Sequence, residues 1–302
     1  MQKKDRSNFA LSGHSLENAS GRAQKGLAKR KLNVLVFGAH PDDCDLQFGG
    51  AAMKYRKLAH RVKFVSLTNG DTGHFSMGGG PLARRRFAEA QASAEIAGIE
   101  YDVLDIHNGE LEPSVENRRT VIRIIREMNA DLVLCHRSND YHPDHRAAGV
   151  LVQDAGYSVT IPNVAPLTPP MSIPPVIGHL FDNFKIPQPF KATIAIDITD
   201  VVEKKIDMIA CHESQVFEWL PYNSGVLEQV PRGARERRKW LAERMYARFS
   251  RVADSCRETL GDCYGEKRGK EIRFAEAIMI SEYGRPLNKE DWPIIFPFFS
   301  AK

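Results

Sequence analysis

Residues 34–50 read VLVFGAHPDDCDLQFGG, and this stretch decides the fold. It opens with the apolar, β-branched and aromatic residues that are typical of a buried strand, and the run ends in Gly38-Ala39. A histidine, a proline and three aspartates follow within residues 40–45, where a dinucleotide-binding turn would have G-x-G-x-x-G. Side chains therefore occupy the place of the backbone amides that bind pyrophosphate, which disfavours NAD binding.

From Leu32 onward, short β-branched runs alternate with longer segments of helical spacing. We expect strands at 33–37, 62–67, 102–106 and 132–135, and helices at 48–58, 82–97 and 115–128. This alternation predicts an α/β fold, a Rossmann-like, mostly parallel sheet with helices on both faces. The C-terminal extension is expected to pack on the same core, with a strand near 192–196, a helix that Asp200 caps and that runs through Ala210, and a last strand in RFAEAIMISEY.

The chain of 302 residues suits one large domain, predicted at 32–302, after a basic segment at 1–31. That segment has eight Lys/Arg and two acids, a net charge of +6, so the remaining residues are slightly acidic and the basic character belongs to the segment, which we expect to be a disordered tail. Residues 161–189 include PNVAPLTPPMSIPPV and are predicted to form a long loop, either a lid or an interface.

Composition argues against several functions. The chain has no apolar run of 18 residues and its N-terminus lacks a secretory apolar region, so neither membrane insertion nor export is expected. Five cysteines without a CxxC spacing indicate reduced thiols and a cytoplasmic protein. The basic run at 231–251 is expected to be an exposed helix that packs through Trp240, Met245 and Phe249, and it contains no RNA-binding motif. A homo-oligomer is compatible with the sequence.

A second polar cluster, CHRSNDYHPDHRAAG, starts at Cys135 at the end of the fourth expected strand. In the common strand order 3-2-1-4, the first and fourth strands are neighbours, so both clusters open into one crevice at their carboxyl ends. Each cluster contains a His-Pro-Asp triplet, and two such triplets on one rim are not expected by chance. We therefore interpret the crevice as a functional site.

The residue types indicate a metal ion. Imidazole and carboxylate donors suit zinc, and three protein ligands with a fourth position left to water mark a catalytic site. His40 and Asp43 are three residues apart and can converge on one ion from a tight turn. Either His142 or His145 can complete the set, and spacing alone does not choose between them.

Asp42 remains free in this scheme, and a carboxylate beside a metal-bound water is placed to act as its general base. The remaining histidine could polarise a carbonyl or protonate a leaving group. Asp144 and Asp45 are candidates for orienting a histidine or another ligand.

At these residues the chain resembles the LmbE-like or PIG-L family of zinc-dependent de-N-acetylases, which act on N-acetylglucosamine conjugates. The family patterns appear here as AHPDDCD and HRSNDYHPDH. The resemblance implies one zinc ion per chain, held by His40, Asp43 and His145. It implies that Asp42 is the base and that His142 stabilises the oxyanion or acts as the acid. Asp144 is predicted to belong to the catalytic residues as well.

Weaker matches to the family patterns predict the substrate contacts Arg86, Asn108 and His212. They are the loop TNGDTG, Arg86 in an RxxE pattern, Asn108 in NGEL and His212 in HESQ. Asn108 stands where the family often has Asp, and Asp45 where it usually has Glu, so the sugar specificity is left open. We expect Arg86 to bind the substrate more than the transition state, so that Arg86→Ala mainly raises KM.

The sequence thus predicts a metal-dependent amidase that removes an N-acyl group, the N-acetyl group foremost, from a small amino sugar conjugate. Two alternatives remain. One is a non-catalytic module that binds a sugar or nucleotide, and the other is a metal-dependent phosphoesterase, which would normally show more carboxylates to bridge two metals.

Overall fold

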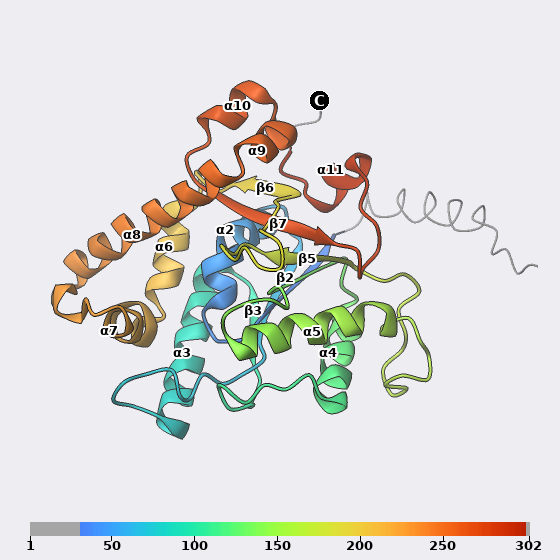
Figure 1. Ribbon diagram of the computed structural model, residues 1–302, viewed down its shortest axis with the longest axis horizontal. Coiled ribbons are helices and arrows are strands. Elements are labelled where there is room, and N and C mark those ends of the chain that lie inside the picture. The colour runs from blue at the N-terminus through green and yellow to red at the C-terminus, as the bar shows by residue number, and fades with distance from the viewer. Residues whose placement is uncertain (1–30, 300–302) are drawn as a thin grey trace, which may run out of the picture. The chain divides into compact units, whose positions relative to one another are not determined.

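One sheet of seven strands organises the part of the chain described by the computed structural model, residues 31–299 (Figure 1). The strand order is β3-β2-β1-β4-β5-β7-β6. The strands are β1 (Asn33–Gly38), β2 (Arg61–Ser66), β3 (Glu100–Val103), β4 (Leu132–Cys135), β5 (Val176–Leu180), β6 (Ile194–Asp197) and β7 (Ala275–Ser281). The first five are mutually parallel and β7 is antiparallel to both its neighbours, so the predicted 3-2-1-4 order and mostly parallel sheet are confirmed.

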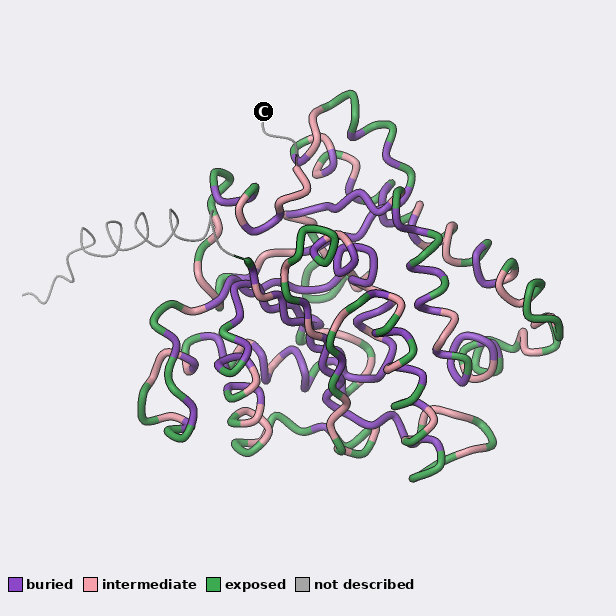
Figure 2. Tube along the Cα trace, turned by 180° about the vertical axis from the view of Figure 1, so that it is seen from behind, coloured by how far each residue is buried: buried purple, intermediate pink, exposed green. Residues whose placement is uncertain are grey.

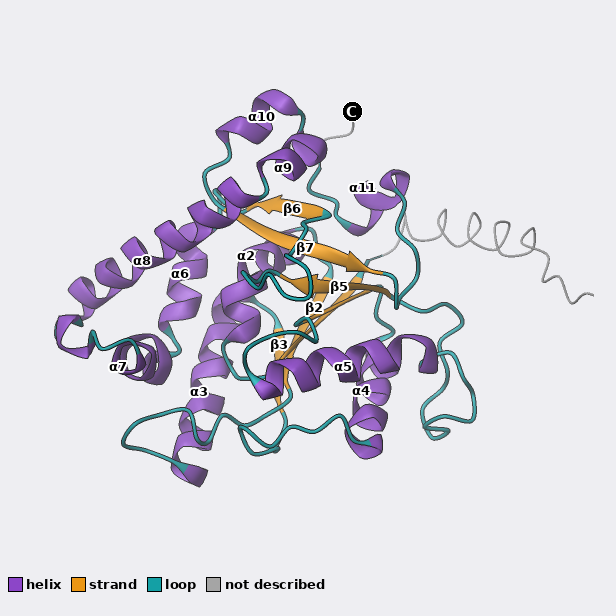
Figure 3. Cartoon of the chain, viewed as in Figure 1, coloured by secondary structure: helices purple, strands orange, loops and turns teal. Residues whose placement is uncertain are grey.

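Helices cover both faces of this sheet (Figures 1 and 3). Helices α4 and α5 pack on one face, and α2, α3, α6 and α8 lie on the other. Their bounds are α2 (Asp43–Lys57), α3 (Gly79–Ala97), α4 (Val115–Met128), α5 (Pro143–Ser158), α6 (Val202–Ala210), α7 (Leu220–Asn223), α8 (Ala234–Ser255), α9 (Arg257–Tyr264), α10 (Glu266–Glu271) and α11 (Trp292–Ile295).

The central strands are buried on both faces, as expected of parallel strands between helices (Figure 2). Leu35 and Phe37 of β1 pack with Ile122 of α4 and Leu151 of α5 in one apolar cluster. On the opposite face, Gly49 of α2 lies against α6 at Met208, where an added Cβ would come within 3.0 Å of the sulfur. This close packing holds α2, whose N-terminus carries the first polar cluster.

Some expected boundaries differ from the structure. Helix α2 begins at Asp43, five residues before the expected start at Phe48, because the polar residues of the motif form its first turn. Asp200 does not cap α6. The cap position belongs to Val201, and Asp200 instead pairs with Lys54 and Lys57 of α2.

The segment 161–189 is not a loop throughout. It contains β5, whose residues VIGHL include no proline and pair with β4 on one side and β7 on the other. The prolines flank the strand, where no ladder hydrogen bond is lost.

Residues 1–30 lie outside the described residues, and so does almost all of the predicted basic tail at 1–31. Among the helices that the structure describes, none combines the length and the apolar character that crossing a membrane requires.

Candidate active site

The two polar clusters meet at the carboxyl ends of neighbouring strands. Val36 of β1 is paired with Leu134 of β4, so the chain leaves both strands at the same edge of the sheet. His40 follows β1 and His136 follows β4, and the amide of Ala39 donates to Nε2 of His136 at 3.3 Å. The predicted meeting of the two clusters is therefore seen in the structure.

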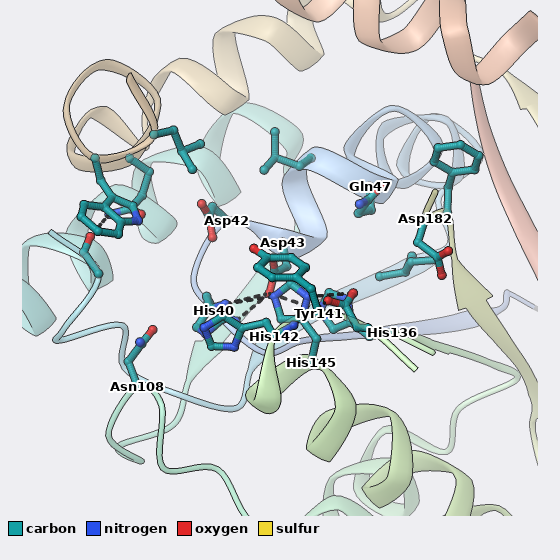
Figure 4. A pocket seen from close by; sticks show the side chains of 18 of the residues that line it. His40, Asp42, Asp43, Gln47, Asn108, His136, Tyr141, His142, His145 and Asp182 are labelled. Carbon is teal, nitrogen blue, oxygen red and sulfur yellow. Dashed lines mark hydrogen bonds and ion pairs between the residues drawn. The ribbon is translucent and has the colours of Figure 1, made fainter. Parts of the chain in front are cut away.

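Three donor atoms form a triangle at this edge. Nδ1 of His40 lies 3.5 Å from Oδ2 of Asp43. Nε2 of His145 lies 3.2 Å from Nδ1 of His40 and 3.5 Å from Oδ2 of Asp43. Tetrahedral zinc with bonds of about 2.0–2.2 Å keeps its ligand atoms about 3.3–3.5 Å apart. The triangle therefore fits the predicted ligand set, and Figure 4 shows these side chains converging around Asp43.

Two overlapping groups of candidate metal donors occur among the described residues. One is His40, His142 and His145, and the other is Asp43, His136 and His145. The predicted set takes members from both groups. Because the two groups share His145, they do not offer two independent ligand sets.

A carboxylate stands behind each of the two histidines of the triangle. Oδ2 of Asp144 lies 3.2 Å from Nε2 of His40, and Oδ2 of Asp140 lies 3.0 Å from Nδ1 of His145. Each carboxylate orients its imidazole and leaves the other ring nitrogen for an ion. Asp144 is fully buried and also accepts hydrogen bonds from the amides of Gly109 and Leu111, so its carboxylate is held in place beside His40.

Asp43 and His40 differ in the charge that they present to a cation. Burial raises the pKa of Asp43, but the positive charges of His145 and His136 outweigh it and hold that pKa well below its ordinary value. Burial lowers the pKa of His40, but its hydrogen bonds to Asp144 and Asp43 outweigh this and raise the pKa to about 9. Asp43 is therefore an ionised donor, and a metal ion binding at His40 competes with a proton.

Asp42 points away from this triangle although it is next to Asp43 (Figure 4). It occupies the cap position of α2, and its Oδ1 accepts a hydrogen bond from Nη2 of Arg86 at 3.0 Å. Arg86 is 2% exposed, and its Nη1 donates to the carbonyl of Gly70. Gly70 has φ +71°, and a Cβ there would lie 2.5 Å from Nη1 of Arg86, so the TNGDTG loop needs this glycine.

His142 caps the other helix of the site. Its Nδ1 accepts the amide hydrogen of Asp144, and Pro143 follows at the first helical position. The hydrogen of a neutral imidazole then resides on Nε2. Burial lowers the pKa of His142, and the nearby His40 and His145 lower it further, which favours this neutral form.

A cavity of about 730 Å³ opens over these groups. It is lined by all three donors, by Asp42 and His142, and by the predicted substrate contacts Arg86 and Asn108. Asn108 donates from Nδ2 to Oγ1 of Thr72 at 2.7 Å and lies on the opposite side of the cavity from Asp182 (Figure 4).

Two predicted roles need correction. His212 was expected to contact the substrate, but it is fully buried, does not line the cavity, and lies 3.2 Å from Oδ1 of Asp45. Asp45 was a candidate for orienting a ligand, but it instead pairs with His212, Ser93 and Tyr101. Asp45 is two residues beyond Asp43 in α2, so its side chain points away from the donors into the core. Gln215 of the same HESQ stretch does line the cavity.

Sequence reasoning assigned no role to His136 or Asp140. His136 lies 3.2 Å from Oδ2 of Asp43 and stacks on His145 with ring centroids 4.0 Å apart. The signal was in the family pattern HxxxDxHPDH, whose first histidine is His136 and whose first aspartate is Asp140.

The fold and this donor set define a class, α/β proteins with a His/Asp metal-type centre at the carboxyl edge of a parallel sheet. The sequence model for "PIG-L: GlcNAc-PI de-N-acetylase" matches residues 35–156. The chain is 33% identical over 206 residues to the diacetylchitobiose deacetylase of Thermococcus kodakarensis, covering 63% of this chain and 74% of that protein. The chain belongs to the PIG-L family.

Other relatives widen the comparison. The chain is 25% identical over 252 residues to a 4-oxalmesaconate hydratase of Pseudomonas putida, covering 78% of this chain and 96% of that protein. The structure of N,N'-diacetylchitobiose deacetylase from Pyrococcus horikoshii shares the fold, with a TM-score of 0.63, 24% identity, and coverage of 93% of this chain and 96% of that one.

Proposed function

We propose that the protein is a zinc-dependent hydrolase that removes an N-acetyl group from an amino sugar conjugate. The observation that carries the proposal is the triangle of His40, Asp43 and His145 with Asp42 beside it on the same cavity. Membership of the PIG-L family, and the relative that is a diacetylchitobiose deacetylase, support the choice of bond and substrate.

Residues of the cavity can be assigned to each proton transfer of the hydrolysis. Zinc, when bound by the three donors, supplies Lewis acidity that acidifies a water molecule and polarises a carbonyl. Asp42 is outside the triangle and faces the cavity, so it takes the proton of the attacking water. Arg86 holds Asp42 in this position through their hydrogen bond.

His142 acts on the other side of the reacting carbonyl. Its Nε2–H is left free by the helix-capping bond of Nδ1, so it donates a hydrogen bond to the oxygen on which negative charge develops. The proton held by Asp42 then passes to the departing amine. Asp144 and Asp140 keep the two histidine donors in orientation throughout.

A hydratase is the second candidate, because one relative that aligns over most of both chains carries that name. Addition of water to an unsaturated acid would use the same base, so the site geometry does not separate the two reactions. A phosphoesterase with two metals is less well supported, since the donor groups of the described residues share His145.

Release of acetate decides between these functions. We would incubate the metal-loaded protein with N-acetylglucosamine, diacetylchitobiose and N-acetylglucosamine conjugates, with the Asp42→Asn protein as the matched control. The proposal predicts acetate release that this substitution slows by about 10²- to 10⁴-fold, with one metal ion per chain. Absence of acetate from every substrate, together with hydration of an unsaturated dicarboxylate, would show that the chain is a hydratase.

A further inference from the structure

An arginine from the C-terminal part of the chain reaches the cavity. Arg248 belongs to α8, far along the sequence from both His-Pro-Asp triplets, and it lines the same cavity as the donor triangle. Sequence reasoning assigned it no function, because it is one of many basic residues in the run at 231–251.

Three arginines line the cavity, and two of them already have anionic partners. Arg86 binds Asp42, and Arg137 binds Asp182, with its Nε 2.6 Å from a carboxylate oxygen. For Arg248, the part of the chain between residues 31 and 299 offers no hydrogen bond, ion pair or ring contact. Arg248 is therefore the arginine of the cavity lining for which the described residues provide no hydrogen bond or ion pair.

Leaving this cation unpaired is unfavourable. Burial lowers the pKa of Arg248, and the charge of Arg251 adds to this, whereas Asp43 and Asp42 act in the opposite direction. A guanidinium that is partly desolvated and makes no hydrogen bond loses hydration without compensation. Such a group gains most from a ligand that brings an anion to it, because a guanidinium binds carboxylate or phosphate through two parallel hydrogen bonds.

The rest of the cavity leaves space for such an anion at this position. A volume of about 730 Å³ lies within the range of about 300–1,000 Å³ that is typical of drug-sized ligands, so it holds more than one acetamido sugar. Asp42, Asp43 and Asp140 also line the cavity, so an anionic substituent needs a cation beside it, and Arg248 is the lining arginine that no carboxylate of the described residues pairs with. Gln47 of α2 and Asn223 of α7 add amides to the lining, and no side-chain hydrogen bond occupies either within the described residues.

We propose that Arg248 binds an anionic group, a carboxylate or a phosphate, on the substrate of this site. The substrate would then be an acidic amino sugar conjugate whose N-acetyl group lies at the donor triangle while its anion lies at Arg248. This inference rests on the proposed deacetylase function for the identity of the reaction, but the anion site can be tested without it.

The first test is a comparison of substrates. The ratio of kcat/KM for an acidic N-acetylglucosamine derivative to that for its neutral methyl glycoside is measured by acetate release, using a phosphate ester and a carboxylate ether in separate arms. A charged hydrogen bond of about 1.5–3 kcal/mol corresponds to a preference of roughly 10- to 150-fold for the acidic substrate. The arm with the larger ratio identifies the anion.

Variants of α8 show whether Arg248 causes that preference. Arg248→Gln should reduce the ratio about tenfold or more, and Arg248→Lys should retain part of it because the charge remains. Arg244→Gln is the matched control, since Arg244 is an exposed arginine of the same helix that stacks on Trp240. An unchanged ratio in Arg248→Gln would overturn the proposal.

A binding experiment separates this proposal from the reaction. Inorganic phosphate is titrated into the metal-loaded wild-type, Arg248→Gln and Arg244→Gln proteins by calorimetry. Phosphate binding that weakens about tenfold only in Arg248→Gln supports the anion site even if no acetate is ever released. Equal affinities, or no binding to the wild type, would overturn it. The melting temperature should change little in Arg248→Gln, because no internal hydrogen bond or ion pair is lost and glutamine keeps much of the aliphatic chain, whereas a structural role would lower it.

Discussion

The two His-Pro-Asp triplets of this chain have the same residues, but the histidine and the aspartate of each triplet occupy different places in the site. In the first, His40 is a donor of the triangle and Asp42 faces the cavity as the candidate base. In the second, His142 faces the cavity and Asp144 is fully buried behind the first histidine. The histidine of one triplet and the aspartate of the other are thus the residues in contact, with His40 and Asp144 sharing a hydrogen bond of 3.2 Å.

The difference follows from where each helix begins. Helix α2 starts at Asp43, so Asp42 is the cap and His40 lies two residues before it. Helix α5 starts at Pro143, so His142 is the cap and Asp144 already lies within the first turn. The helix starts two residues earlier relative to the second triplet than relative to the first. Side chains in a helix project about 100° apart from one residue to the next, so the histidine and the aspartate of the two triplets point in different directions. Substitutions at four residues of the site test this comparison.

The largest effect is expected from Asp43→Ala. Asp43 supplies one corner of the donor triangle, and its Oδ2 also accepts the amide hydrogen of His40 at 2.8 Å. Removing it leaves two protein donors, so zinc content after gel filtration should fall to background. Asp42→Asn serves as the control and should keep its metal. If the Asp43→Ala protein retained one zinc ion per chain, the ligand assignment would be wrong.

Asp42→Asn should lower kcat by about 10²- to 10⁴-fold, the usual contribution of a general base. The amide keeps the size of the side chain and an oxygen that can accept from Arg86. Metal content and the unfolding transition should therefore change little. Steady-state kinetics and elemental analysis on one preparation check this, and a fully active, metal-loaded variant would remove Asp42 from the mechanism.

Asp144→Asn should weaken zinc affinity by about 10- to 100-fold, the usual effect of losing a carboxylate that orients a histidine ligand. The matched control is Asp154→Asn, an exposed carboxylate of the same helix that pairs with Arg118. Competition with a chelator measures both affinities. Equal affinities in the two variants would show that the buried aspartate of the second triplet does not act through His40.

The smallest effect separates the two roles of His142. His142→Ala loses the imidazole and the helix cap, whereas His142→Asn loses only the imidazole because asparagine is a good N-cap. Both variants should lose kcat alike, but the free energy of unfolding of the Ala variant should be about 1 kcal/mol lower, as measured in denaturant. If the two variants were equally stable, the hydrogen bond from the amide of Asp144 to His142 would not contribute to the free energy of unfolding.

Arg86 shows how the structure extends a prediction made from sequence. Its RxxE position suggested substrate binding and a rise in KM, and the residue does line the cavity. Its hydrogen bond to Asp42 adds a second expectation, that Arg86→Ala also lowers kcat. Measuring kcat and KM separately distinguishes these two contributions.

The first four strands, the helices between them and the edge of the sheet at which the two polar clusters meet could be predicted from the sequence, whereas β5 within 161–189 was missed. Strand periodicity and the rule that ligands lie at the carboxyl ends of parallel strands are local and topological, so they can be predicted from one chain. The resemblance of AHPDDCD and HRSNDYHPDH to a family then assigned the donors, and the structure places their donor atoms within 3.5 Å of one another.

Which side chains face the cavity could not be predicted from the sequence and is seen in the tertiary structure. Asp45 and His212 have the chemistry of a site but are buried together, whereas Asp140 lies 3.0 Å from Nδ1 of His145, a contact that the sequence pattern alone does not show. Arg248 becomes a cavity residue because α8 packs on α6 and β7, over 100 residues along the chain from the metal donors of both clusters. The direction of a side chain depends on where its helix starts and on which distant element covers it, and neither is encoded in the local pattern.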